Sequence, residues 1–163
     1  MRKMFRIFVP VLMAAALASA VFAQGRIAEL RSRFAAESDS VRRAKMMPQL
    51  GDAEFQQIQK DIADGRADDA LAVLRQYLAE AQACEKGFDA SGIDAEKHPS
   101  GFKQLQISLQ ESLRRLNAEV PQLTSDEQAP FLDIRKEISD MDARLIHKLF
   151  PHEPVTESAK PKD

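Results

Sequence analysis

Three histidines and one cysteine are the side chains in this 163-residue chain best suited to metal binding or nucleophilic chemistry. His147 and His152 lie on either side of Pro151, where a helix must end, so they do not share a helix face. The chain has no HExxH motif, no CxxC motif and no pair of histidines four residues apart, so the spacing that a zinc site needs is absent. His98 is far in the sequence from His147 and His152. We therefore predict no metal site and no cofactor.

Catalytic motifs of other kinds are also missing. The sequence contains no GxSxG motif, no phosphate-binding loop and no dinucleotide fingerprint. Cys84 falls beside the apolar side of its helix, which favours a buried, inert thiol; an intermolecular disulfide is the functional alternative. Non-covalent binding of a haem by Met46 or Met47 together with His147 stays an alternative, although no motif supports it. We expect a protein that is not an enzyme.

The amino terminus has the three parts of a secretory signal peptide. Arg2, Lys3 and Arg6 are basic, residues 9–20 are apolar or small, and small residues end the segment at Ala23. The apolar run is shorter than the roughly 20 residues of a spanning helix, so a retained membrane anchor is the lesser alternative. We predict a signal peptide at 1–23 and export to the periplasm or beyond the cell. Any membrane contact would then come only from an uncleaved signal.

The charge and the cysteine content of the exported part argue against nucleic-acid binding and against an intramolecular disulfide. Removing Arg2, Lys3 and Arg6 from the chain's 23 Lys and Arg leaves 20 against 25 Asp and Glu, a net charge of −5. Nucleic-acid-binding domains normally carry a basic surplus, so nucleic acid is not an expected partner. With one cysteine, no intramolecular disulfide can form, and apolar packing must hold the fold together.

Two apolar stripes at helical spacing define the fold class. One stripe recurs at steps of three and four, and consists of Phe102, Leu105, Leu109, Leu113 and Leu116. A second begins at Phe131 and ends at Leu149. Ile107 points away from the first stripe and meets either a partner or solvent. We predict an all-α bundle of four to five helices, built from antiparallel hairpins in a single domain over 24–150.

The remaining segments are organised by turn and cap signals. Residues 26–47 form one helix or two, since Ser38-Asp39-Ser40 interrupts the apolar pattern. Residues 48–51, with Pro48 and Gly51, predict a turn, and Asp52 a helix cap. A hairpin over 52–86 turns at Gly65, and 87–101 is the least regular internal segment. The last helix starts at a Thr124–Glu127 or Ser125–Gln128 capping box, or else at Pro130. We expect 151–163 to be a disordered tail.

The first helical segment is locally basic. Arg31, Arg42, Arg43 and Lys45 are the candidate residues for a surface that binds an acidic partner or an anionic lipid. A solvated helix face is the competing interpretation of the same charges.

The hairpin over 52–86 carries part of a repeat signature: Gly65, Asp68, Asp69, Ala70 and Leu71. These residues occupy the glycine, acidic and Ala-Leu positions at the turn and second helix of a tetratricopeptide repeat, so the segment resembles one such unit. It departs from the repeat at Glu54, Ile58, Tyr77 and Gln82, and no second copy follows. The resemblance implies an antiparallel helical hairpin.

Residues 123–128 read Leu-Thr-Ser-Asp-Glu-Gln at a helix start. In a short, exported, helical chain this resembles the periplasmic stress chaperones that carry an LTxxQ motif. Gln128 comes one residue later than in that motif, and only one copy is present. The resemblance implies a holdase that cradles unfolded clients.

The sequence thus favours a non-catalytic module that binds an unidentified protein or peptide of the bacterial envelope. A periplasmic chaperone of the LTxxQ kind is the first alternative, and a small-molecule or haem carrier is the second. Neither the oligomeric state nor the identity of a partner follows from the sequence.

Overall fold

This computed structural model describes residues 25–151 of the chain. They form five α-helices and one short 3-10 helix, joined by short connections. The helices are 25–36, α2 (Ser40–Ala63), α3 (Ala67–Ser91), α4 (Ser100–Glu119), η1 (Val120–Gln122) and α5 (Ser125–Leu149). The predicted all-α fold is confirmed for these residues. The predicted signal peptide, and all of the predicted tail except Pro151, lie outside them. No helix within 25–151 combines the length and apolarity needed to cross a membrane.

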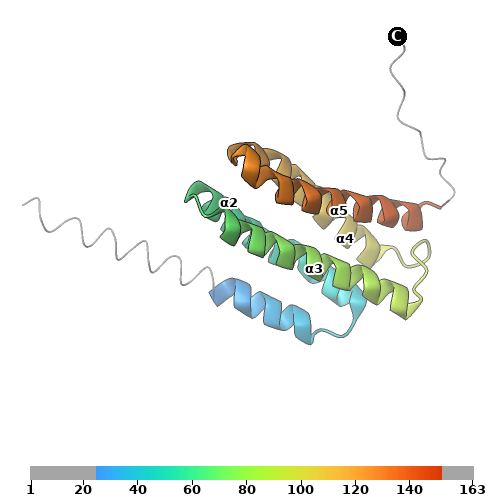
Figure 1. Ribbon diagram of the computed structural model, residues 1–163. Coiled ribbons are helices and arrows are strands. Elements are labelled where there is room, and N and C mark those ends of the chain that lie inside the picture. The colour runs from blue at the N-terminus through green and yellow to red at the C-terminus, as the bar shows by residue number, and fades with distance from the viewer. Residues whose placement is uncertain (1–24, 152–163) are drawn as a thin grey trace, which may run out of the picture.

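The helices form two antiparallel hairpins that lie side by side (Figure 1). One hairpin is α2–α3 and the other is α4–α5. Successive helices alternate in direction, so α2 runs parallel to α4, against which it packs, and α5 packs against α4 and α3. Helix 25–36 lies on the first hairpin, on the side away from α5. The predicted bundle of antiparallel hairpins is thereby confirmed.

Local capping explains three helix ends: the start and the end of α2 and the start of α5. The Asp39 side chain accepts a hydrogen bond from the backbone N–H of Arg42 at 2.8 Å, so 26–47 is split between two helices. Gly65 ends α2 with a φ of +72°, a conformation that favours glycine. At the start of α5, the backbone N–H of Thr124 donates to the Glu127 carboxylate at 3.0 Å. This capping box places Pro130 inside α5 rather than at its start.

The predicted turn at 48–51 is wrong, and so is the cap at Asp52, because α2 continues through both. Pro48 lacks the N–H that would bond to the carbonyl oxygen four residues earlier, so the helix loses one hydrogen bond there. On either side of it, Met47 and Leu50 are buried in the core. Burying two large side chains contributes about 1.5–3 kcal/mol each, which is enough to outweigh the loss.

We expect Pro48→Ala to raise the free energy of unfolding by about 1–3 kcal/mol, because alanine restores the missing donor at an exposed position. Urea denaturation monitored by circular dichroism measures the change. A variant less stable than the wild type would contradict this account of α2.

The third helix is also longer than predicted. It runs through Gly87 to Ser91, and the loop covers only 92–99. A Cβ atom added to Gly87 would lie 3.0 Å from the Cβ atom of Ser40. Gly87 therefore allows the first turn of α2 to approach α3 closely and does not end the helix. Gly92, with a φ of +63°, is the residue that does.

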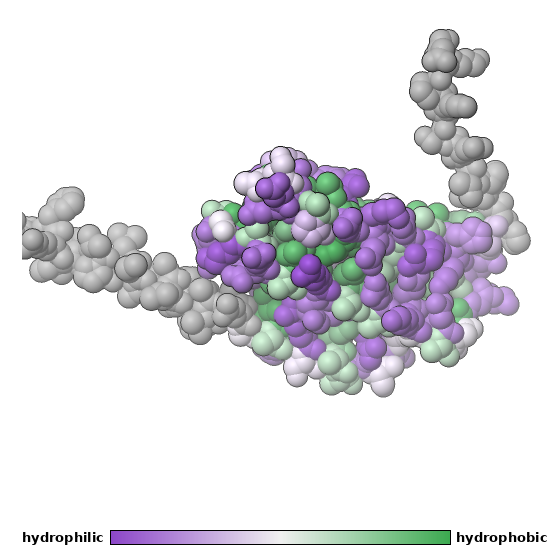
Figure 2. Space-filling view, in the orientation of Figure 1, coloured by the Kyte–Doolittle hydropathy of each residue, from purple (hydrophilic) through white to green (hydrophobic). Residues whose placement is uncertain are grey.

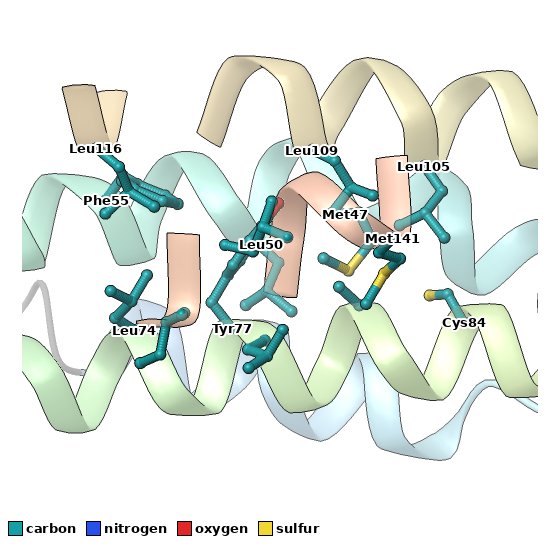
Figure 3. Packing of buried hydrophobic residues seen from close by; sticks show 14 of the residues in the cluster. Met47, Leu50, Phe55, Leu74, Tyr77, Cys84, Leu105, Leu109, Leu116 and Met141 are labelled. Carbon is teal, nitrogen blue, oxygen red and sulfur yellow. The ribbon is translucent and has the colours of Figure 1, made fainter. Parts of the chain in front are cut away.

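The core lies between the two hairpins. Figure 3 shows Met47 and Leu50 from α2, Leu105 and Leu109 from α4, and Met141 from α5 packed together. The predicted second stripe is buried in full: Phe131, Ile134, Ile138, Met141, Leu145 and Leu149. On the face seen in Figure 2, polar side chains predominate, and apolar ones come to the surface mainly between α3 and α5.

Candidate functional site

A solvent-open groove of about 470 Å³ runs between α2 and α4. Its volume falls within the range of about 300–1,000 Å³ that is typical of ligand sites. Both helices and one side chain of α3 line it: Met47, Pro48, Gln49, Gly51, Asp52, Phe55, Tyr77, Gln104, Ile107, Ser108, Glu111, Ser112 and Arg115. The groove combines an apolar wall with charged groups of both signs at its edge.

The groove exists because small residues stand where α2 faces α4. Gly51, Ser108 and Ser112 are buried there, and none of them fills the space that a leucine would. Tyr77 reaches from α3 into this gap (Figure 3), and a Cβ atom added to Gly51 would lie 3.0 Å from its ring. A larger residue at position 51 would therefore displace the tyrosine that forms the floor of the groove.

The floor is held by hydrogen bonds as well as by packing. The hydroxyl oxygens of Tyr77 and Ser112 are 2.5 Å apart, and they lie 3.3 Å and 2.8 Å from the carbonyl oxygen of Ser108. Burial raises the pKa of Tyr77, so its hydroxyl stays protonated and can donate. One carbonyl and two hydroxyls thus satisfy each other, so each of these buried groups has a hydrogen-bond partner.

Charged groups at the groove edge are paired with one another. Arg115 bonds to Asp52 on α2, and its Nε donates to Glu111 at 2.8 Å. Arg114 donates to the same carboxylate at 2.6 Å, and the two arginines together lower the pKa of Glu111 to about 2. Glu111 is therefore ionised at any physiological pH. The arrangement suits charge recognition and not proton transfer.

Ile107 is the exposed apolar residue at this edge, with 56% of its surface open to solvent. The sequence placed it off the main stripe, and the structure puts it beside the groove, facing the same hollow as Pro48. An isoleucine so exposed beside an apolar hollow offers a contact for an apolar side chain of a partner.

A second unusual cluster lies under helix 25–36, where Arg31 meets two buried glutamates. Arg31 Nε donates to Glu54 Oε1 at 2.8 Å and lies 3.3 Å from Glu80 Oε1. Gln76 donates to the same Glu80 oxygen at 3.0 Å. The Oε2 atoms of both glutamates are buried and accept no hydrogen bond from a donor in the described residues. Two carboxylates face one guanidinium, so one negative charge is in excess.

A proton on Glu54 resolves that excess. Burial, followed by the charge of Glu80, raises the pKa of Glu54 to about 8, and burial also raises the pKa of Glu80. Protonated Glu54 can donate to Glu80, which supplies the donor that their Oε2 atoms lack. At neutral pH the pair therefore holds one shared proton beside Arg31.

We expect the free energy of unfolding to fall as pH rises from about 5 to about 8. Glu54 in the unfolded chain loses its proton near 4.5, whereas the folded protein keeps it to about 8, so the folded state binds more protons in this interval. The slope is at most about 1.4 kcal/mol per pH unit for one proton. Urea titrations at three pH values measure it, and Glu54→Gln should flatten the curve. An equal slope in that variant would assign the effect to other groups.

The predicted partner residues do not gather into one surface. Arg31 points to the buried glutamates, and Arg43 donates to the backbone carbonyl of Glu37 and lies over the Phe34 ring. Arg42 is exposed with an ion pair to Glu37 at 3.4 Å. Lys45 is exposed and forms no ion pair within 25–151. A partner role for Arg42 and Lys45 stays a prediction, whereas two of the four charges serve internal contacts.

Lys45 lines a second hollow of about 570 Å³ at the end of the bundle. The apolar side chains of Val41, Ile93 and Pro99 form its wall, and Lys97 and His98 stand with Lys45 at its edge. Lys97 pairs with Asp94 at 3.2 Å, which leaves Lys45 as the lysine at this edge with no ion pair in the described residues.

The structure does not bring the candidate haem ligands together. Met47 is fully buried among core residues, Met46 is half-buried, and His147 lies on the exposed side of α5. Cys84 is a free, buried thiol, and burial raises its pKa to about 12. Among residues 25–151, no group of three or more His, Cys, Asp or Glu side chains is arranged to hold a metal ion.

The fold defines a small all-α bundle of two stacked hairpins with one added helix. Comparison of the chain with protein-family models, with curated proteins and with solved structures finds no match. The resemblances to a tetratricopeptide hairpin and to the LTxxQ chaperones therefore stay predictions.

Proposed function

We propose that this protein is exported and binds a short segment of an envelope protein, without catalysis, in the groove between α2 and α4. The observation that carries the proposal is an exposed isoleucine, Ile107, beside a solvent-open groove of about 470 Å³. Preformed hollows with an apolar wall and a few fixed polar groups are typical of binding sites.

The groove indicates which segment it would bind. An apolar side chain of the partner would lie against Ile107 and Pro48, the exposed apolar residues of the groove. Asp52, Glu111 and Arg115 line the groove, and Arg114 also bonds to Glu111, so two guanidinium groups balance the two carboxylates. Gln49 and Gln104 offer amide groups for the partner's backbone. We therefore expect a segment with an apolar anchor and no preference for one sign of charge beside it.

Selection from a random peptide library tests this expectation. The peptides retained by the exported protein should share an apolar anchor, and Ile107→Asp should weaken the best of them at least ten-fold. A buried anchor of this kind is typically worth about 2 kcal/mol or more. Leu132→Asp is the matched control, because Leu132 is 46% exposed on α5 outside the groove. Binding by fluorescence anisotropy should be unchanged in that variant.

Two outcomes would overturn the assignment. Equal loss of affinity in both variants would show that the groove is not the site. Retention of many unrelated peptides with no shared anchor would instead favour a holdase of the LTxxQ kind.

Export is a separate part of the proposal and has its own test. The protein recovered from the envelope fraction should begin at Gln24, which amino-terminal sequencing or intact mass determines. A mature chain that retains Met1 would contradict cleavage after Ala23.

The hollow beside Lys45 supports a second candidate, a carrier of small anionic amphiphiles. Its apolar wall and unpaired lysine match a carboxylate on an acyl chain. Displacement of a fluorescent fatty acid measures binding. Lys45→Glu should weaken it at least ten-fold, whereas Lys60→Glu, at an exposed position of the same helix, should not. Equal affinities in the two variants would remove this candidate.

A further inference from the structure

Within the described residues, helix 25–36 contacts the first hairpin through a few side chains. Its apolar side chains Ile27, Leu30 and Phe34 are buried, and Arg31 is its one ion-pairing residue within the described part of the chain. Only residues 37–39 join it to α2, and it lies on the outside of the bundle (Figure 1). Elements with so few buried contacts open locally at much lower free energy than the whole fold.

The Arg31 cluster, defined as Arg31, Glu54 and Glu80, lies between this helix and the hairpin. Helix 25–36 contributes Arg31, α2 contributes Glu54, and α3 contributes Glu80 together with the neutral Gln76. Neighbouring groups are Tyr77, Cys84 and Arg43. Burial keeps Tyr77 and Cys84 protonated, and Arg43 is occupied by the Glu37 carbonyl. The cluster thus has a single guanidinium for two carboxyl groups.

We propose that the Arg31 cluster is a pH-sensitive attachment that holds helix 25–36 on the hairpin in mildly acidic solution and releases it progressively as the solution becomes alkaline. Closed, the cluster is compatible with one shared proton between Glu54 and Glu80. When the helix lifts away, both carboxyl groups meet water and no longer need that proton. Loss of a proton therefore favours the open form.

The size of the effect follows from proton linkage. A group that is protonated in the closed form and ionised in the open form shifts the opening equilibrium by up to about ten-fold per pH unit. The interval is bounded by the ordinary glutamate value of 4.5 and the raised pKa of Glu54, about 8. Opening should therefore increase by one to two orders of magnitude between about pH 6 and pH 8.

Hydrogen exchange with mass spectrometry tests this on the mature chain. After correction for intrinsic rates, protection of the amides in 25–36 should fall at least ten-fold from pH 6 to pH 8, while protection in α5 stays constant. Glu54→Gln, which mimics the protonated side chain, should abolish the fall. Glu80→Gln removes the like charge and should reduce it, and this second variant serves if the first does not fold.

Three results would overturn the proposal. Protection of the amides in 25–36 that does not change with pH would show that the helix is not released. An equal fall in α5 would indicate global unfolding. A fall that persists in both glutamine variants would exclude the Arg31 cluster as its cause. None of these results bears on peptide binding in the groove, which uses other residues.

Discussion

Replacing Arg31 with alanine is expected to destabilise the protein by about 3 kcal/mol at pH 8. Removing one partner of a buried ion pair typically costs about 3–5 kcal/mol, because the remaining charge stays buried without compensation. We expect the lower end of that range because Arg31 keeps 32% of its side-chain surface exposed. Glu54, by contrast, is fully buried and cannot reach water while helix 25–36 is in place. The loss should be smaller at pH 5.5, well below the raised pKa of Glu54, where that side chain carries a proton.

Arg33→Ala is the matched control for this change. Arg33 lies on the same helix, is exposed, and its side chain forms no hydrogen bond or ion pair within 25–151. A surface substitution of this kind usually changes stability by less than about 0.5 kcal/mol. Urea denaturation of both variants at the two pH values gives the comparison. Equal stabilities of the two variants at pH 8 would mean that Arg31 is not part of a buried ion pair.

Replacing Phe88 with alanine should destabilise the protein by about 3–5 kcal/mol, as is typical of a buried phenylalanine. The Phe88 ring is buried at the end of α3 and stacks on Phe102 of α4, with ring centroids 4.2 Å apart and an interplanar angle of 22°. It also lies 3.0 Å from the position of a Cβ atom added to Gly101. This contact joins the two hairpins at the loop 92–99, so its loss opens a cavity between them.

The control is Phe150→Ala, because Phe150 is 45% exposed at the end of α5. It should change the free energy of unfolding by less than about 1 kcal/mol. Thermal or urea denaturation monitored by circular dichroism compares the two variants. A loss in Phe88→Ala no larger than in Phe150→Ala would contradict the packing of α3 on α4.

The fold was largely predictable because its helices bury most of their apolar stripes, with Leu113 only partly buried. Leu105 and Leu109, like the residues from Phe131 to Leu149, face the core at the spacing that the sequence shows. The ends at Gly65 and Thr124 were predictable for the same reason: a left-handed glycine and a capping box act locally. Where tertiary packing opposed a local signal, the prediction failed, as at Pro48 and Gly87.

The candidate site was much less predictable. Ser108 and Ser112 look in the sequence like ordinary polar positions of a helix, and nothing there indicates that both are buried. Their role depends on Tyr77, which is 31 residues away from Ser108 and comes from another helix. Glu54 and Glu80 likewise read as surface carboxylates until Arg31 is placed over them. Ile107 was the one residue whose sequence position pointed to the groove, because it is apolar and lies off the apolar stripe of its helix.

Site-specific photocrosslinking in the cell envelope tests the central claim, that the α2–α4 groove binds a segment of a partner protein. A photoreactive residue is placed at Gln49 or Gln104, which line the groove, and at Leu132 or Ile146, which are exposed on α5. The groove positions should give one shared adduct, lost on Ile107→Asp and on addition of a selected peptide, and the α5 positions should not. Adducts that survive Ile107→Asp, or that form equally from α5, would contradict a binding site in the groove.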